Sequence, residues 1–449
     1  MRTGLTVVAL LLILALTAAL IGPYYVDWNR QRAIVEAQLS HVLRERVAVK
    51  GAIDLKLLPS PYITLNQVEI SDPKTGGVLF SCNEMELTLG LTALVRGQFR
   101  FTQASFDHPT LDLSSGPDGG IVWPKLNLAT NSESIAFDKV IVRDGRVRVM
   151  RIDGVVETSL DGVDLDAEAD SLLGPYKGSG RAPGPGGARL AFNFATGAIE
   201  GANLRFKAAV DAGSEAPRSE FDGALVFAGP TSTSGAAAIG YTGAAAFSGM
   251  IKGADAPMPW RASGALKADL SSASLDNLEV RVGAEDRALA ANGSAQMAFG
   301  ATSRASVTLA AKQLNFDALL RVEGEDSASP AKAYRALSGA LAGLESEGGP
   351  LVALSLELGA PAVILGGDTI ADATLSMAAD PGAPIALKLE ASPPGRSHIL
   401  ASGAVDVGPA ADFKGRIDMR IGDSQRLRDW LTLDAPDLRA RLEIGRAHV

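Results

Sequence analysis

One uncharged stretch near the N-terminus constrains this chain more than any other feature. Residues 3–26 read TGLTVVALLLILALTAALIGPYYV and carry no charged side chain. As an α-helix rising about 1.5 Å per residue, the run would extend about 36 Å and could cross a hydrocarbon core of about 30 Å. We therefore predict that residues 1–26 form a single transmembrane anchor. The anchor positions are Leu5, Val8, Leu12, Leu16, Leu20, Tyr24 and Trp28.

The residues that flank this run predict its orientation. Arg2 precedes it, and Tyr24, Tyr25 and Trp28 follow it as an aromatic belt, so the positive-inside rule places the N-terminus in the cytoplasm. The alternative is a cleaved secretory signal with a small-residue site at 17–19. Such signals have apolar regions of about 7–15 residues, which are shorter than this run. Both interpretations place the bulk of the chain outside the cytoplasm.

Composition and charge exclude some classes of function. The 449 residues carry a net charge of -9 and only 5% aromatic residues, and no cluster of Lys and Arg is interleaved with aromatics. This argues against a nucleic-acid partner. Cys82 is the one cysteine, so no disulfide can form within the chain. We expect it to be a small buried thiol on a strand.

Residues 27–46 are predicted to form a short amphipathic helix, which Asp27 or Asn29 can cap. The helix would either lie on lipid headgroups or close the end of the strands that follow. We favour the second alternative, because strand-like alternation begins at Val47. The apolar stripe is Ile34, Val35, Gln38, Leu39, Val42 and Leu43, and the charged face is Arg30, Arg32, Glu36 and Arg44.

From residue 47 onward, apolar and polar residues alternate with the period of β-strands. A bulge is expected at Asn66-Gln67, where the alternation slips. Turn sequences such as Asp72-Pro73 and Asp144-Gly145 recur at short intervals, which predicts strands that meander antiparallel. Each strand would have one apolar and one polar face.

Residues 171–442 are rich in Gly and Ala, yet short strand-like runs persist at the spacing of all-β proteins. Residues 304–324 and 414–434 share an order of strand, polar break and half-helix. Leu319 and Leu431 lie near the ends of these half-helices. The pattern suggests one unit that recurs.

One longer helix is predicted between these two segments. Ser329 would cap it, Pro330 would occupy its first turn, and its stripe would be Tyr334, Leu337, Leu341 and Leu344. Together the patterns predict a mainly β fold. It would be an elongated, curved antiparallel sheet with an open groove and a few covering helices.

No catalytic or metal-binding pattern occurs in the sequence, which has no G-x-S-x-G, P-loop or H-E-x-x-H motif. Asp161, Asp164 and Asp166 could suggest calcium binding or acid–base chemistry. They alternate with Val163 and Leu165, so the solvated face of a strand is favoured. We expect no enzyme, cofactor or metal. The histidines are scattered without ligand spacing and include His41, His108 and His398.

Several segments resemble the AsmA family of bacterial envelope proteins, specifically over the first 150 residues and more loosely beyond. The residues that carry the resemblance are Asp27, Trp28 and Arg30 after the anchor, Gly51-x-Ile53-Asp54, Leu58-Pro59-x-Pro61, the run from Leu65 to Ile70, and the strand pair from Ile141 to Met150.

The resemblance implies a function. AsmA-like proteins are grouped with bridge-like lipid-transfer proteins, whose elongated β-groove carries phospholipids while the headgroups stay in water. It implies a single-pass inner-membrane protein of cell envelope biogenesis that extends into the periplasm and passes phospholipids between the inner and outer membranes. The groove residues would be Ile53, Leu55, Leu57, Ile63, Leu65, Val68, Ile70, Leu87, Leu89 and Leu91.

Two alternatives remain open. The same apolar face could be the packed core of an ordinary sandwich. The protein could also be a structural or assembly factor whose open strand edges pair with outer-membrane proteins.

The expected organisation has five parts: the anchor (1–26), the amphipathic helix (27–46), an AsmA-like β domain (47–170), continuing β-strand repeats (171–442) and a tail (443–449). The tail reads EIGRAHV, which GAGATCGGAAGAGCACACGTC, the start of a common sequencing adapter, would encode. Our hypothesis is a non-native tail on a C-terminally truncated reading frame.

Overall fold

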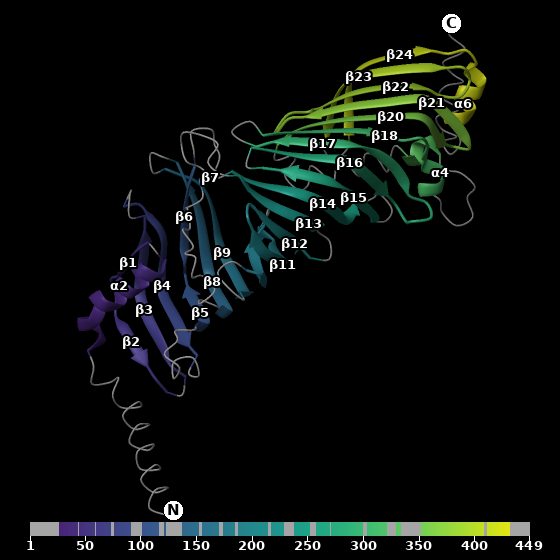
Figure 1. Cartoon of the computed structure of the whole chain (residues 1–449). Coiled ribbons are helices and arrows are strands. Elements are labelled where there is room, and N and C mark those ends of the chain that lie inside the picture. The colour runs from purple at the N-terminus through teal and green to yellow at the C-terminus, as the bar shows by residue number, and fades with distance from the viewer. Residues whose placement is uncertain are drawn as a thin grey trace, which may run out of the picture. The chain divides into compact units, whose positions relative to one another are not determined.

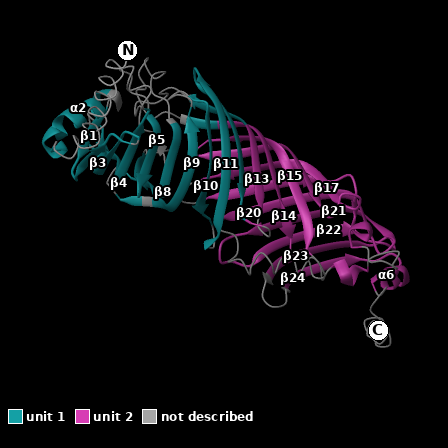
Figure 2. Ribbon diagram, turned by 90° about the horizontal axis from the view of Figure 1, so that it is seen from below, with its two compact units in different colours: residues 1–212, 223–240 teal, residues 213–222, 241–449 magenta. Residues whose placement is uncertain are grey.

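The computed structural model describes residues 27–43, 45–58, 60–72, 76–90, 101–115, 121–122, 137–151, 155–169, 174–184, 187–213, 217–228, 238–251, 257–269, 271–299, 303–320, 329–333, 352–407 and 411–431. The predicted anchor run and the tail lie outside these ranges. Within them, no helix combines the length and the apolar character that a membrane span needs. The chain divides into two compact units, which are described separately: residues 1–212 with 223–240, and residues 213–222 with 241–449 (Figure 2).

Unit 1 begins with two short helical segments and continues as strands (Figure 1). The helical segments are η1 (Trp28–Gln31) and α2 (Arg32–Leu43). The expected boundary at residue 170 lies between two strands that pair with each other, β9 and β10. The strands are β1 (Arg46–Val49), β2 (Ile53–Lys56), β3 (Tyr62–Ser71), β4 (Val78–Leu89), β5 (Phe101–Asp107), β6 (Thr110–Ser115), β7 (Ile121–Val122), β8 (Phe137–Met150), β9 (Val156–Ala169), β10 (Tyr176–Pro183), β11 (Arg189–Glu200) and β12 (Asn203–Asp211).

Unit 2 is also mainly β, with two short helices, α4 (Phe316–Leu319) and α6 (Ser424–Leu431). Two strands have residues in both units, β13 (Arg218–Ala228) and β14 (Ala238–Ile251). The others are β15 (Met258–Ala268), β16 (Ser272–Val282), β17 (Leu289–Ala298), β18 (Arg304–Ala310), β19 (Leu314–Asn315), β20 (Ala353–Leu365), β21 (Asp368–Ala379), β22 (Ile385–Ser392), β23 (His398–Val407) and β24 (Ala411–Arg420).

Most neighbouring strands pair antiparallel, but each unit contains a parallel step. In unit 1, β8 runs parallel to β5 and β6, and in unit 2, β20 runs parallel to β18 and β19. The predicted antiparallel pairing is interrupted at these two places. A parallel neighbour requires the chain to cross back before the next strand begins. Long connections precede β8 and β20, and turn signals in the sequence do not show where such a connection returns.

A line of backbone irregularities crosses the sheet of unit 1. β1 and β2 pair with successive parts of β3, and the residues between them, 50–52, lie opposite residues 66–67. Gln67 has a φ of 53° at this point. The irregularity predicted at Asn66-Gln67 is therefore confirmed, although the extra residue belongs to the opposite segment. The register between β8 and β9 also shifts beside Asp144, whose φ is 50°, but here the extra residue is on the strand of the left-handed residue itself.

The irregularity decides which residues share a face. Leu65 and Val68 are three positions apart, so strict alternation would place them on opposite faces. Both are nevertheless buried, at 0% and 1% exposure. The left-handed residue between them restores the apolar side chains to one face.

The same arrangement recurs in β16 of unit 2. Asn277 has a φ of 52°, and Leu275 and Leu278 on either side of it are both buried. The sequences correspond as well, LNQVEI at residues 65–70 and LDNLEV at 275–280. This repeat escaped the sequence analysis.

A glycine faces the irregularity in both units. A Cβ on Gly51 would lie 2.7 Å from the Cβ of Asn66, and one on Gly264 would lie 2.8 Å from the backbone oxygen of Asp276. Real Cβ atoms do not approach that closely, so only glycine fits beside each irregularity. The extra residue lies on the segment of Gly51 in unit 1, but on the strand opposite Gly264 in unit 2. The two units therefore share a left-handed residue between two buried apolar positions and a glycine beside it.

The two helical segments of unit 1 cover the outer edge of β1 and β2. Four of their side chains, three or four residues apart, bond to backbone groups at alternate strand positions. Val35 and Leu39 pack on the core below. The bonds run from Val47 N–H to Ser40 Oγ (3.0 Å), from Val49 N–H to Glu36 Oε1 (2.7 Å), from Ile53 N–H to Asn29 Oδ1 (3.1 Å) and from Arg32 Nη2 to the Gly51 carbonyl (2.8 Å).

The predicted helix is therefore confirmed, and it closes the edge of the sheet that follows. Asp27 is its N-cap. Two details of the prediction are wrong. Ile34 is 60% exposed instead of buried in the stripe, and Arg32 and Glu36 face the strand edge instead of solvent. A strand edge offers unpaired N–H and C=O groups, which attract the polar side of the helix.

In unit 2, α4 and α6 end the two predicted segments of strand and half-helix. Leu427 and Trp430 of α6 are buried with Leu365 at the end of β20, and Phe316 and Leu320 pack against them. The recurrence of strand and half-helix is thus confirmed, but Leu431 is exposed. Of the longer predicted helix, residues 329–333 are described. Ser329 caps its first turn, since its Oγ accepts from Lys332 N–H at 3.2 Å.

Polar contacts from both helices fasten the turn that follows β20. The Asp317 carboxylate accepts from Gly366 N–H and Gly367 N–H, each at 2.8 Å. Trp430 Nε1 donates to the Leu365 carbonyl at 2.8 Å. Hydrogen bonds from both α4 and α6 therefore hold the end of β20 and the turn that follows it.

Candidate functional site

The predicted apolar face of unit 1 forms, and the strand register brings its residues together. The predicted positions on β2, β3 and β4 lie beside one another across the sheet. Neighbouring pairs are Ile53 with Leu65, Leu55 with Ile63, Ile63 with Leu87, Val68 with Cys82, and Ile70 with Phe80.

Four of the predicted groove residues are fully enclosed by protein. Ile53, Leu65, Val68 and Leu87 form one core with strand neighbours such as Met85, and α2 packs against it. The sequence could not reveal this, because the covering helix bonds to the strand through polar side chains. These four residues present almost no surface to a ligand.

The other predicted groove residues are more accessible. Leu55, Ile63, Ile70 and Leu89 are half-buried on the same strands. Leu57 is also half-buried but lies beyond the end of β2. The remaining prediction, Leu91, lies outside the described residues, as do all the anchor positions except Trp28. Trp28 lies in η1 and packs against the core of unit 1.

Unit 2 carries a second apolar face, whose residues are not among the predicted groove positions. Each of its central strands alternates a half-buried large apolar residue with an exposed polar or small one. The signal was present in runs such as LVALSLELG and IALKLEA. Two rows cross the strands β20, β21 and β22, namely Leu356, Met377 and Leu387, and Leu358, Leu375 and Leu389.

Half-burial has a simple cause here. Neighbours on the same sheet shield the flanks of each side chain, whereas a second layer would be needed to cover its tip. All strands in the described part of unit 2 belong to one hydrogen-bonded sheet, and its helices α4 and α6 lie at the end of β20. The apolar face of β20–β22 is therefore a half-buried surface of aliphatic side chains, some of which also pack against buried neighbours.

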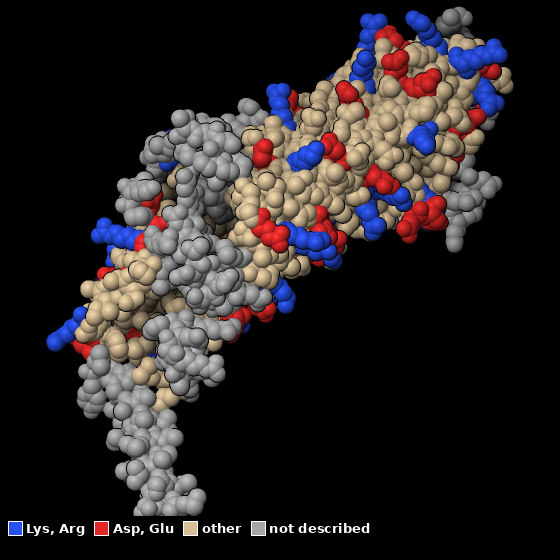
Figure 3. All heavy atoms as spheres, in the orientation of Figure 1, with Lys and Arg blue, Asp and Glu red and all other residues tan. Residues whose placement is uncertain are grey.

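The opposite faces of the strands are polar. Figure 3 shows acidic and basic side chains interspersed over the face in view. In unit 1, Asp161, Asp164 and Asp166 are partly exposed on β9, as expected, and arginines pair with them. The partners of Asp161 and Asp166 are Arg146 and Arg143.

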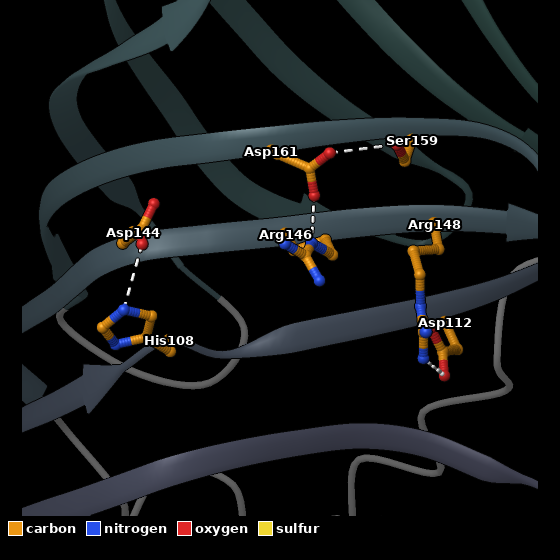
Figure 4. A network of polar contacts seen from close by, with 7 residues as sticks. All are labelled: His108, Asp112, Asp144, Arg146, Arg148, Ser159 and Asp161. Atoms are coloured by element: carbon orange, nitrogen blue, oxygen red, sulfur yellow. Dashed lines mark hydrogen bonds and ion pairs between the residues drawn. The ribbon is translucent and has the colours of Figure 1, made fainter.

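A polar network marks the irregular line between β5, β6, β8 and β9 (Figure 4). The imidazole of His108 lies between two carboxylates, with Nδ1 2.9 Å from Asp107 Oδ2 and Nε2 3.0 Å from Asp144 Oδ2. The hydrogen bond to Asp107, supported by the charges of Asp107 and Asp144, raises the pKa of His108 above its usual value. The charged form of His108 is thereby favoured.

A second ion pair in this network joins the parallel strands β6 and β8. Arg148 donates from Nε and Nη2 to the two oxygens of Asp112, each at 2.7 Å. This bidentate bond raises the pKa of Arg148. Asp112 is buried, so its charge needs this partner. We interpret the network as an electrostatic clamp across the irregular line, because each charge already faces an opposite one.

Cys82 is a buried thiol on β4, as predicted. Burial raises its pKa to about 12, so it stays protonated at neutral pH. Among the described residues, no group of three or more His, Cys, Asp or Glu could hold a metal ion.

Comparison with known proteins identifies the family to which the chain belongs. A sequence model of the AsmA family matches residues 1–320, well over half of the chain. The protein therefore belongs to the AsmA family, and the match extends beyond the N-terminal 150 residues that carry the quoted motifs. No curated protein and no solved structure gives a significant match.

Proposed function

We propose that this protein is a membrane-anchored periplasmic component of cell envelope biogenesis. It would bind phospholipids by their acyl chains and pass them between the inner and outer membranes. Two observations support the proposal: membership of the AsmA family and the half-buried apolar face that alternates with a polar one. The apolar face is the observation that favours an acyl chain as the ligand.

The energetics favour an aliphatic ligand. Covering apolar surface yields about 25 cal/mol per Å², or about 0.8 kcal/mol for each buried CH₂ group. An acyl chain laid across rows of Leu and Met side chains would gain this along its length without a polar contact. The headgroup would remain in water at the edge of the face, since its charge is costly to bury.

The lining residues proposed for acyl contact are the half-buried ones. In unit 1 these are Leu55, Ile63, Ile70 and Leu89, and in unit 2 the two rows on β20–β22. Similar side chains recur from row to row, so neighbouring positions would bind an acyl chain with similar free energy. Movement along them would then need no energy source within this chain.

The test is lipid retention by the purified full chain. Leu387→Asp places a carboxylate on the apolar face, whereas Lys388→Glu changes the next residue on the exposed face. Phospholipid extracted from the wild type and from Lys388→Glu should be equal. It should fall at least severalfold in Leu387→Asp, with the circular dichroism spectrum unchanged.

Retention of the same amount of phospholipid by Leu387→Asp would contradict the proposal. Absence of extractable phospholipid from the wild type would do so more directly. Either result would favour the alternative, a structural or assembly factor for outer-membrane proteins.

A further inference from the structure

The apolar residues of β20 in unit 2 become more enclosed from one end of the strand to the other. Leu354, near the start of the strand, is 37% exposed, and Leu356 and Leu358 are half-buried. Farther along, Ala360 is 4% exposed and Val363 is 8% exposed. The apolar face therefore has an accessible side and an enclosed side along the same strand.

The enclosed side ends in packed apolar residues, here called the wall. Helices α4 and α6 lie at this end of β20 (Figure 1), and hydrogen bonds from Asp317 and Trp430 fix the turn that follows the strand. Packing and hydrogen bonds thus hold the wall in place. Its residues include Leu314, Phe316, Val363, Leu365, Leu427 and Trp430.

The accessible side is the opposite end of the same strands, here called the rim and marked by Phe299, Leu354 and Ala379. Leu354 lies beside Ala379 of β21. Phe299 follows the last residue of β17, which lies at the same end through its pairing with β18. Phe299 is 42% exposed. Large apolar side chains therefore contact water at the rim.

The depth from rim to wall corresponds to the length of an acyl chain. At about 3.3 Å per residue, the stretch from Leu354 to Ala360 extends about 20 Å. A hydrocarbon core of about 30 Å holds two leaflets, so the acyl chains of one leaflet reach about 15 Å. An acyl chain laid along the strands would therefore fit between the rim and the wall.

The face suits an acyl chain better than a polypeptide segment. β20, β21 and β22 each pair with a strand on both sides, so their backbone groups are already hydrogen-bonded to one another. A polypeptide covering them would bury its own N–H and C=O groups without partners, which is costly. An acyl chain has no such groups, and a headgroup at the rim would keep its charge in water.

We infer, on the basis of the proposed lipid binding, that unit 2 holds acyl chains along its strands, with the headgroup at the rim and the chain end against the wall. The wall would then limit the length of acyl chain that binds. Ala373 is the specificity-determining position, because it is half-buried on the face and lies beside Ala360, where the accessible stretch ends.

The first test enlarges this position in the purified full chain. The protein, in non-ionic detergent micelles, is given equal amounts of dimyristoyl and distearoyl phosphatidylglycerol, and the retained lipids are measured by mass spectrometry. Each CH₂ group that the ring of Ala373→Phe excludes should lower affinity about fourfold. The retained ratio of the shorter to the longer lipid should therefore rise severalfold above that of the wild type.

Ala378→Phe is the matched control for this test. It makes the same substitution on the same strand, but at an exposed position of the opposite face. Its lipid ratio should equal that of the wild type.

The second test measures orientation and leaves the wall unaltered. A fluorophore is attached to Leu354→Cys at the rim, where the side chain is exposed, while the buried Cys82 stays unlabelled. Phosphatidylcholine with a nitroxide on its headgroup should quench this fluorophore more strongly than phosphatidylcholine with a nitroxide at the end of an acyl chain.

The outcomes separate this inference from the proposed function. Lipid retained by Ala373→Phe at the wild-type ratio would overturn the wall as the limit on acyl length. Equal or stronger quenching by the chain-end nitroxide would overturn the orientation, and this result decides alone if circular dichroism shows that Ala373→Phe does not fold. Absence of phospholipid from the wild type would instead contradict lipid binding itself.

Discussion

The helices of the two units contact their strands in different ways. At the edge of β1 and β2, side chains of η1 and α2 bond to alternate backbone groups. In unit 2, α6 packs instead on the end of β20, where Trp430 and Leu427 are buried with Leu365. The helices of unit 1 thus cover a strand edge through polar contacts, whereas α6 of unit 2 packs on a strand end through apolar ones. A helix beside a sheet therefore need not protect its edge.

The apolar faces of the two units also differ, in how far their side chains are buried. Leu65 in unit 1 is fully enclosed, whereas Leu387 in unit 2 is half-buried, although both occupy inward positions of alternating strands. The alternation is the same, and the neighbours are not. Burial, and with it the availability of a strand face to a ligand, is decided by what packs on it.

The largest expected effect tests this contrast between the two faces. Leu65→Asp should lower the free energy of unfolding by more than about 4 kcal/mol, because an unpaired carboxylate would be enclosed. Leu387→Asp should cost roughly 1 kcal/mol, since its carboxylate can reach water. Chemical denaturation followed by circular dichroism measures both. Equal losses would mean that the two faces are alike and that the face of unit 2 is also a closed core.

A smaller effect is expected at the turn between β20 and β21, to which Asp317 is hydrogen-bonded. Asp317→Ala leaves Gly366 N–H and Gly367 N–H without their acceptor, which should cost about 1–3 kcal/mol. Asp317→Asn keeps one acceptor oxygen and should lie between Ala and the wild type. Thermal unfolding of the three proteins gives the order. If Asn and Ala were equally destabilised, the charge of Asp317 would matter more than the hydrogen bonds.

The closed edge of unit 1 offers the next test. Glu36→Ala removes the acceptor for Val49 N–H and should cost about 1 kcal/mol, whereas Glu36→Gln keeps an acceptor oxygen and should recover most of it. Ile34→Ala is the control, because Ile34 is an exposed position on the same helix. Hydrogen exchange at Val49 should accelerate in Glu36→Ala alone. Unchanged exchange there would show that the helix does not protect the edge.

The smallest effect distinguishes two left-handed positions, one in each unit. Asn277 occupies a left-handed position in unit 2, and His108 occupies one in unit 1, but only His108 titrates. Its pKa is raised in the folded protein, so its stabilising contribution is fully present below the unfolded pKa of about 6.5 and is lost as pH rises through the folded pKa.

The stability of the wild type should therefore fall slightly across that pH window, whereas His108→Asn should show a flatter profile. Asn is chosen because it tolerates a left-handed backbone. Asp144→Asn, which removes one carboxylate partner, should shift the His108 titration to lower pH in an NMR experiment. An unshifted titration would show that Asp144 does not interact with the imidazole in solution.

Local patterns were sufficient for much of the fold. The alternation of Ile53, Leu55, Ile63 and Leu65 predicted strands with one apolar face, and the register places those residues side by side. The slip at Asn66-Gln67 predicted the irregularity, and Ser329 predicted its cap. These features depend on residues close in sequence, where side-chain size and period decide the backbone. The family resemblance was likewise carried by short motifs.

Contacts between residues far apart in sequence could not be predicted and are known only from the tertiary structure. It decided that β8 and β20 return parallel, that Arg32 and Glu36 turn inward to a strand edge, and that Leu65 is enclosed while Leu387 is not. The period of a strand states which residues share a face, but burial depends on which other segment covers that face. That choice is made by packing over the whole unit, which no single stretch of sequence specifies.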